Sequence, residues 1–234
     1  MSKKELTKSV EALPEKSPLD MSFSSETIST NDIIMPKLWA MQGLSELVND
    51  GKAKLGDLVD SLTSEVLGGF STPVRFVPID FKKLWYRTRG RELVEVLAVT
   101  PDNEHLPFED AHGIKNSRAM IFYGLIGDSQ LPYMINFKGT SFVEGKKLLT
   151  MGFVLPQMAK MKPQDFAFNI GTKKESNDKG TYAVYTISKC GASTEAERDL
   201  AKIWGHMISA SKASRPKVDE SEDSKMYVKE DMTF

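Results

Sequence analysis

The sequence of 234 residues is poor in the residue types that form disulfides and metal sites. It contains one cysteine, Cys190, and three histidines, His105, His112 and His206. A single cysteine excludes an internal disulfide and a cysteine-based zinc site, and three histidines provide few ligands for a metal ion. We therefore expect no metal and no other cofactor, in a protein of the reducing cytoplasm.

Long apolar runs are also missing. No stretch approaches the roughly 18 to 20 apolar residues of a membrane span. The first residues, Met1-Ser-Lys-Lys, lead into a polar segment that lacks the apolar core of a signal peptide. We expect neither membrane association nor secretion.

Catalytic signatures are weak. The sequence has no glycine-rich phosphate loop ending in Lys-Ser or Lys-Thr, no Gly-x-Ser-x-Gly and no His-Glu-x-x-His. Carboxylates lie near histidines only within 102–112, in the residues Asp102, His105, Glu109, Asp110 and His112. Such a cluster could hold a metal or transfer protons, but its polar, proline-containing context favours a solvated loop. We expect a protein that is not an enzyme.

Three regions of the chain differ in composition and charge. Residues 1–32 are rich in Ser, Thr, Lys and Glu and have little periodicity, so they predict a disordered leader. Residues 33–213 predict a single β-rich domain, and 214–234 a flexible acidic tail. The stretch 33–217 has 25 basic and 20 acidic residues, a net charge of +5. A basic body with an acidic arm has the polarity expected of a nucleic-acid binder that masks itself with its tail.

Patterns of apolar residues in the domain predict seven or eight short strands. The stretches that indicate strands are 33–41, 74–85, 120–126, 133–138, 166–170 and 182–189. A bulge is expected at Pro78, and 93–99 could be strand or helix. A polar turn from 172 to 180 is expected to join the last two strands into a hairpin.

Two helices complete the predicted domain. Residues 141–151 predict a helix that ends near Gly152. Thr194, followed three positions later by Glu197, is a capping box that opens an amphipathic helix. Strands with two helices make a β-rich α+β domain, and the strand count permits an oligonucleotide-binding (OB-like) Greek-key barrel elaborated by helices.

The segment 81–91 favours nucleic-acid binding because it interleaves three aromatic rings with five cations. On a strand, Phe81, Lys83 and Trp85 would face one way and Lys82, Leu84 and Tyr86 the other, so one aromatic row is buried while the other can be exposed. An alternating row of arginines could clamp phosphates. The alternative is an amphipathic edge strand whose cations discourage aggregation. The candidate DNA-binding residues are Trp39, Lys82, Lys83, Trp85, Tyr86, Arg87, Arg89, Arg91 and Lys138.

Further lysines are secondary basic candidates. They are Lys52, Lys54, Lys146, Lys147, Lys173 and Lys174. Each of these is expected to be solvated.

The last 17 residues, 218–234, form an acidic arm that ends in Phe234. Six acids against two lysines give it a net charge of −4, and so few apolar side chains cannot offset the entropy of ordering. We expect a mobile arm whose only strong anchor is Phe234. The candidate partner-binding residues are Asp219, Glu220, Glu222, Asp223, Glu230, Asp231 and Phe234.

An acidic arm that ends in phenylalanine resembles the C-terminal tail of bacterial and bacteriophage single-stranded DNA-binding proteins, especially the T7-type phage replication protein. In those families the tail docks on replication enzymes and competes with DNA for the protein's own basic groove. The resemblance implies polymerase, helicase or primase as partners and supports the OB-like fold. Lys225 and Lys229 interrupt the acids, and Met232 and Thr233 separate the last acid from Phe234, so this tail is a weaker mimic of DNA. Residues 36–69 also loosely resemble bacteriophage proteins found among replication genes.

These features together predict a sequence-tolerant single-stranded DNA-binding protein of phage replication or recombination, acting in the host cytoplasm. It would protect single strands and recruit replication partners through its tail. Two alternatives stay open: a phage interaction, regulatory or virion protein that binds another protein and no DNA, and an enzyme of nucleic-acid metabolism that uses 102–112. The sequence leaves the oligomeric state open, including a homo-oligomer.

Overall fold

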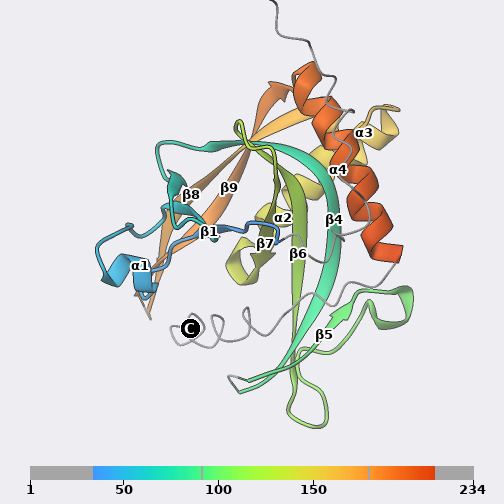
Figure 1. Ribbon diagram of the computed structural model, residues 1–234. Helices are drawn as coiled ribbons and strands as arrows, with labels where there is room; N and C mark the ends of the chain where they lie inside the picture. The colour runs from blue at the N-terminus through green and yellow to red at the C-terminus, as the bar shows by residue number, and fades with distance from the viewer. Residues whose placement is uncertain (1–33, 91, 179, 214–234) are drawn as a thin grey trace, which may run out of the picture. The chain divides into compact units, whose positions relative to one another are not determined.

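The computed structural model describes residues 34–90, 92–178 and 180–213, with side chains described as far as 209. Two antiparallel sheets organise this part of the chain (Figure 1). The six-stranded sheet consists of β4 (Val74–Arg89), β5 (Glu92–Ala98), β6 (Lys115–Ile126), β7 (Pro132–Lys138), β8 (Phe166–Asn177) and β9 (Gly180–Ala192). The three-stranded sheet consists of β1 (Leu38–Ala40), β2 (Leu58–Asp60) and β3 (Val66–Gly68).

The helical elements are shorter and connect the strands. They are α1 (Glu46–Asn49), η3 (Pro101–Asn103), η4 (Gly139–Ser141), α2 (Phe142–Leu149), the π-helical turn η5 (Thr150–Val154), α3 (Leu155–Met158), η6 (Pro163–Asp165) and α4 (Glu195–Ala213). The β-rich α+β class predicted from the sequence is confirmed. The first and last regions of the predicted organisation, 1–32 and 214–234, lie outside the described residues.

β4 is the central strand of the larger sheet. One of its edges pairs with β6 from Phe76 to Thr88, while the other pairs first with β8 and then, from Leu84 onward, with β5. The register between β4 and β6 shifts between Pro78 and Asp80, so the bulge predicted at Pro78 is present. A proline has no N–H to donate to the ladder, and a bulge bends its strand. Figure 1 shows β4 as a long, curved strand.

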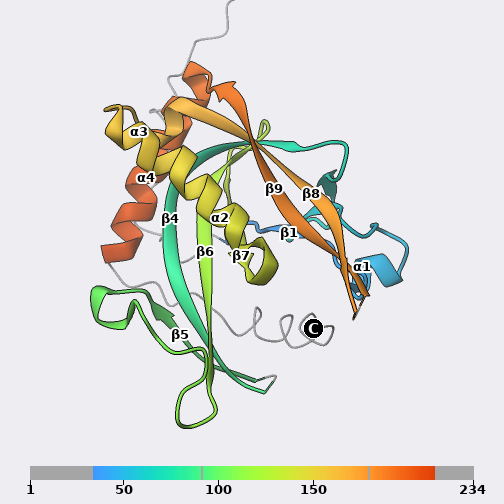
Figure 2. The same ribbon diagram turned by 180° about the vertical axis from the view of Figure 1, so that it is seen from behind.

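The two faces of this sheet carry different cores. One face packs Phe122, Phe137 and Phe168 against the helix that begins with α2. The opposite face packs Leu84 and Tyr86 with Ile208 of α4. Figures 1 and 2 show the two helices on opposite sides of the curved sheet. Aromatic and branched side chains at alternating positions of β4, β6 and β7 supply both cores.

The described strands form two open sheets and do not close into a barrel, so the OB-like part of the predicted fold is not confirmed. Side chains occupy the free edge of β9 in place of a further strand. The N–H groups of Ala183, Tyr185 and Ile187 donate to Oε1 of Gln42 at 3.1 Å, Oγ of Ser141 at 3.2 Å and Oε2 of Glu144 at 3.2 Å. Because these alternate N–H groups already have acceptors, this edge does not need a partner strand.

The helix predicted to end near Gly152 continues instead through the π-helical turn to Met158. Gly152 is buried, and a Cβ placed there would lie at ordinary contact distance from Leu148 and Phe168. Tertiary packing thus outweighs the low helix propensity of glycine. The helical residues end at Met158, and Lys160, two residues further on, has a φ of +55°. The N–H groups of Met161 and Lys160 donate to Pro156 O and Gln157 O, the pattern of a Schellman motif.

The turn predicted over 172–180 is also wrong, because β8 and β9 stay paired to Asn177 and Gly180. The hairpin itself is confirmed. The polar residues that suggested a turn, among them Lys173 and Lys174, are exposed residues of the paired strands. Two residues are enough to connect the strands of a hairpin. The segment 93–99, which the sequence left open, is the strand β5.

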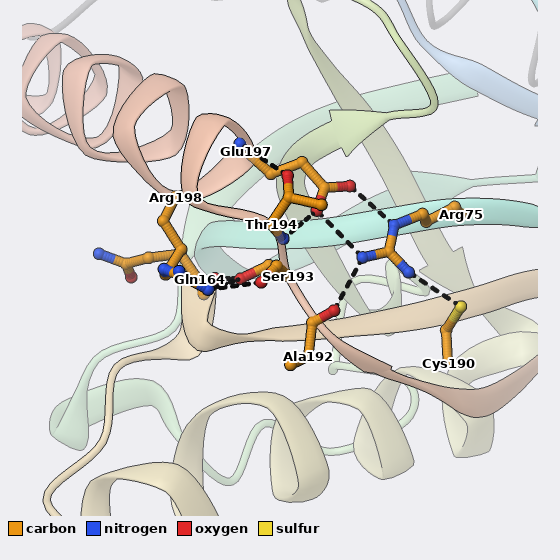
Figure 3. Close-up of polar contacts among 8 residues, drawn as sticks. All are labelled: Arg75, Gln164, Cys190, Ala192, Ser193, Thr194, Glu197 and Arg198. Atoms are coloured by element: carbon orange, nitrogen blue, oxygen red, sulfur yellow. Dashed lines mark hydrogen bonds and ion pairs between the residues drawn. The ribbon is translucent and has the colours of Figure 1, made fainter.

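Arg75, near the start of β4, fixes the first turn of α4 to the sheet (Figure 3). Its guanidinium donates to both carboxylate oxygens of Glu197, at 2.7 and 3.0 Å, to Ala192 O at 2.9 Å and to Cys190 Sγ at 3.1 Å. The predicted capping box is present as well: Glu197 N–H donates to Thr194 Oγ1 at 3.2 Å, and Thr194 N–H donates to Glu197 Oε2 at 2.6 Å. These bonds, the one from Arg75 above all, lower the pKa of Glu197 to about 2.

Candidate nucleic-acid interface

The pleat of β4 divides the candidate residues of 81–91 between the two faces of the sheet. Lys83 and Trp85 lie opposite Met120 and Arg118 of β6, on the face that carries α2. Lys82 and Tyr86 alternate with them and lie on the face that carries α4. Lys138 joins this second group, since it pairs with Ala119, the partner of Leu84. The predicted set therefore does not form one surface.

Trp85 is enclosed in this structure, with 5% of its surface exposed. Its Nε1 donates to Asn103 O at 2.9 Å, and the Arg118 guanidinium carbon lies 4.8 Å from the ring centroid. The segment 99–104, which we call the strap, and Arg118 together cover the ring. A base could stack on Trp85 only if one of these covers moved.

Tyr86 is buried too, with 8% of its surface exposed. It packs with Leu84, Ile121 and Ile208, and its hydroxyl accepts a hydrogen bond from Asn136 Nδ2 at 3.1 Å. Of the two aromatic rows that the alternation predicts, the row with Tyr86 belongs to the core beneath α4. In the other row, Trp85 lies beneath the strap, and Phe81 packs against Phe122 and Phe153 on the face of α2.

Arg87 is committed to contacts within the protein. Its guanidinium pairs with Glu95 at 2.7 Å and Asp110 at 2.8 Å, and its Nε donates to Asn116 Oδ1 at 3.1 Å. The hydrogen bond to Glu95, followed by that to Asp110, raises the pKa of Arg87. Arg87 thus ties β5 to the loop before β6, which leaves it less available for phosphates than the sequence predicts.

The carboxylate and histidine segment 102–112 has a structural role at Asp110. Its Oδ1 accepts the N–H groups of His112 at 2.8 Å and Ile114 at 3.0 Å. The bond from Ile114, then those from His112 and Arg87, lower the pKa of Asp110. Within 34–90, 92–178 and 180–213, no three His, Cys, Asp or Glu residues gather closely enough to hold a metal ion.

A pocket on the face of α2 brings together three cations that lie far apart in the sequence: Lys83 of β4, Arg118 of β6 and Lys146 of α2. The other residues that line it are Val99, Glu104, Ala119, Met120, Phe142 and Leu149. We call it the cationic pocket. The sequence singled out Lys83 and noted Lys146 only as a solvated lysine, and it missed Arg118.

Packing of α2 against the sheet positions Lys146 beside this pocket. A Cβ at Gly145 would lie 2.7 Å from Phe137 Cβ, so only glycine allows the helix to approach β7 this closely. Phe142 and Leu149 pack against the core from the same helix. The ammonium of Lys146 lies 5.2 Å from the Phe142 ring centroid, an arrangement typical of a cation–π contact.

The charges of the cationic pocket are unbalanced. Among the described residues, Lys83, Arg118 and Lys146 form no ion pair, and Glu104 is the only acid in the lining. Arg118 donates to Glu104 O and stacks on Trp85, so its guanidinium is held in place. A held guanidinium with two lysines beside it attracts an anion.

The remaining candidates lie elsewhere or outside the described residues. Trp39 is half-buried in β1 and packs with Met41 and Val59 on the smaller sheet. Arg89 is exposed at the end of β4. Arg91 and the candidate partner-binding residues of 219–234 lie outside the described part of the chain.

Fold and site together describe a β-rich protein with a cationic pocket on the face of a curved antiparallel sheet. Residues 8–96 match the model of a family described as Pam3 phage gp34-like protein. This similarity indicates a bacteriophage protein. The part of the matched segment that the structure describes runs from residue 34 to residue 96, through β1 to β4 and into β5. This part includes Lys83 but neither Arg118 nor Lys146.

No curated protein and no solved structure matches the chain. In the part of the chain that the structure describes, none of the helices has the length and apolar character needed to cross a membrane.

Proposed function

We propose that this protein binds single-stranded DNA without sequence preference and without catalysing a reaction, in the replication or recombination system of a bacteriophage. Acting in the host cytoplasm, it protects single strands and delivers them to replication enzymes. The observation that supports this proposal is the cationic pocket. Proteins that bind single strands in this way combine a positive surface along the backbone with aromatic rings on which bases stack.

The sheet face of α2 supplies the charge directly, whereas its aromatic ring is covered. Lys83, Arg118 and Lys146 supply charge without acidic partners among the described residues, and Arg89 is exposed on the same strand as Lys83. Trp85 lies beneath Arg118. A strand that follows this face would neutralise its phosphates on the cations, and a base would stack on Trp85 only after the strap or Arg118 moves.

Fluorescence anisotropy with a labelled oligonucleotide tests the proposal. If about four phosphates are contacted, log affinity for a single strand falls with log salt with a slope of about −2.8. We expect tighter binding to the single strand than to its duplex, and no cleavage with or without added divalent metal. Binding without any salt dependence, or no binding at all, would contradict the proposal.

The tail, 218–234, is proposed to occupy the basic face when DNA is absent and to recruit polymerase, helicase or primase when DNA displaces it. Its net charge of −4 opposes the net charge of +5 of 33–217. Deletion of 218–234 should tighten DNA binding and abolish partner binding, whereas Phe234→Ala should affect only partner binding. A loss of DNA affinity on deletion would show that the tail does not mask the site.

A second candidate function, a protein-binding phage protein without DNA affinity, is favoured by an apolar surface. Val154, Leu155, Met158 and Met161 are exposed on and after the helix that runs from α2 to α3 (Figure 2), and Met158 has 77% of its surface exposed. Clustered exposed apolar side chains often mark protein interfaces. Absence of DNA binding, together with capture of a phage or host protein that Met158→Glu prevents, would favour this function.

A further inference from the structure

We propose that the cationic pocket seats one phosphate group, contacted by Lys83, Arg118 and Lys146. This inference rests on the proposed function, in which the phosphate belongs to the bound strand, and it specifies where that strand is held. The three cations come from β4, β6 and α2 and line a single hollow. One anion in that hollow can therefore meet all three.

Two arginines of the same sheet differ from these three cations. Arg75 pairs with Glu197, Arg87 with Glu95 and Asp110. These arginines are balanced by acids of the protein. In the cationic pocket three like charges are close together and only Glu104 opposes them, and like charges that share a site repel one another unless an anion offsets them.

Arg118 supplies the directional contact. One of its N–H groups donates to Glu104 O, and its plane lies over Trp85. A guanidinium has five donors, so the others stay available to a ligand. Its planar fork fits two oxygens of a phosphate, and because the side chain is already held, little entropy is lost on binding.

Lys83 and Lys146 supply the charge. Both lysines are exposed, and they line the pocket from different elements, β4 and α2. The aliphatic residues of the lining, among them Val99 and Leu149, offer no hydrogen-bond acceptor from their side chains. The lining therefore has a net charge of about +2, which suits a phosphate group with its charge of about −1 in a diester and −1.5 to −2 in a monoester.

Variants of the two lysines test the inference in the full chain. Each lost phosphate contact should lower the salt slope by about 0.7, which is about fivefold in affinity at 0.1 M salt. Because both lysines contact the same phosphate, Lys83→Gln with Lys146→Gln should weaken single-strand binding about fivefold. Lys54→Gln and Lys189→Gln are matched controls, because both lysines are exposed and neither forms an ion pair with a described residue.

The two proposals fail in different ways. If the wild type binds no oligonucleotide, the proposed function is wrong. If it binds, but the pocket variants keep the affinity and salt slope of the controls, the phosphate seat is wrong and the DNA is held elsewhere.

A second measurement detects phosphate binding in the cationic pocket without DNA. Because Arg118 covers Trp85, a phosphate bound to Arg118 should shift the Trp85 indole Nε1–H resonance, whereas the indoles of Trp39 and Trp204 lie on other elements. Titration with inorganic phosphate should produce this shift in the wild type and in both controls but not in the lysine double variant. A Trp85 resonance that phosphate does not move in the wild type would overturn the inference.

The source of the phosphate is distinguished with oligonucleotides. A 5′-phosphorylated single strand that binds at least fivefold more tightly than its 5′-hydroxyl counterpart, with the difference lost in the double variant, assigns the pocket to a terminal phosphate. Equal affinities that fall together in the double variant assign it to an internal phosphodiester. A double variant that reduces neither affinity would contradict both.

Discussion

The start and the middle of β4 hold arginine and lysine side chains in opposite ways. Near the start, Arg75 donates from all three guanidinium nitrogens to Glu197, Ala192 and Cys190, and the arrangement fixes α4 (Figure 3). In the middle of the strand, Lys83 joins Arg118 and Lys146 in a pocket with a single acid, Glu104. The comparison teaches that the number of cations on a strand does not identify a binding surface. What identifies it is whether the protein supplies their counter-charges.

The comparison predicts a separation of stability from binding, and the largest expected effect is on stability. Arg75→Met removes the charge-assisted hydrogen bonds to Glu197. A hydrogen bond to a charged group contributes about 1.5 to 3 kcal/mol, so unfolding in urea should show that the free energy of unfolding falls by about 2 to 3 kcal/mol. DNA affinity should stay within twofold of the wild type. Lys202→Gln, which removes an exposed pair with Asp199 on α4, is the control and should cost less than about 0.5 kcal/mol.

An Arg75→Met variant as stable as the control would show that the contacts at the start of β4 do not hold α4. A variant that lost DNA affinity in proportion to its stability would also remove the contrast between the start and the middle of the strand.

The reverse pattern is expected at the cationic pocket. Lys83→Gln with Lys146→Gln should lose about fivefold in affinity at 0.1 M salt, while the free energy of unfolding changes by less than about 0.5 kcal/mol, because neither lysine has an acidic partner among the described residues. Urea unfolding and anisotropy on the same preparation check both parts. Substantial destabilisation of this double variant would mean that the lysines are structural after all.

A third expectation concerns pH. The pKa of Glu197 is lowered to about 2 in the folded protein from its ordinary value of 4.5. Its contribution to stability is therefore complete above about pH 5 and is lost as pH falls through 4.5 toward 2. Glu197→Gln should lower stability at pH 7 and flatten the decline of stability across this window, as urea unfolding at several pH values would show. A wild-type curve that Glu197→Gln lowers equally at every pH would refute this assignment.

The smallest expected effect is at the end of the helix that begins with α2. Lys160 holds a φ of +55°, a conformation that costs a non-glycine residue about 1 kcal/mol. Lys160→Gly should therefore stabilise the protein by up to about 1 kcal/mol and leave DNA affinity unchanged, since this lysine lies outside the cationic pocket. Thermal unfolding measures the gain, and a loss of stability would contradict it.

Local patterns in the sequence predicted the local structure well. The alternation of 74–85, the proline bulge at Pro78 and the capping box of Thr194 and Glu197 each depend on neighbouring residues, and each is present. The helix end at Gly152 was wrong because burial against Phe168 outweighs propensity there. The closed barrel was not confirmed because side chains of Gln42, Ser141 and Glu144 occupy the edge of β9, which no strand pattern reveals.

The candidate site was predicted less well, since it depends on register between distant segments. Arg118 reaches Trp85 because β4 and β6 pair with this particular register, and Lys146 reaches the same place because Gly145 allows close packing of α2. Neither relation is visible as a motif. The signal that could have identified Arg118 is its place directly before the apolar run 119–126, which is buried in β6.

The most direct test of the account is the salt dependence of single-strand binding by the full chain, measured for the wild type and for Lys83→Gln with Lys146→Gln. The account predicts a wild-type slope of about −2.8 that falls in magnitude to about 2.1 in the double variant. A wild type that does not bind, or a double variant whose slope equals that of the wild type, would contradict it.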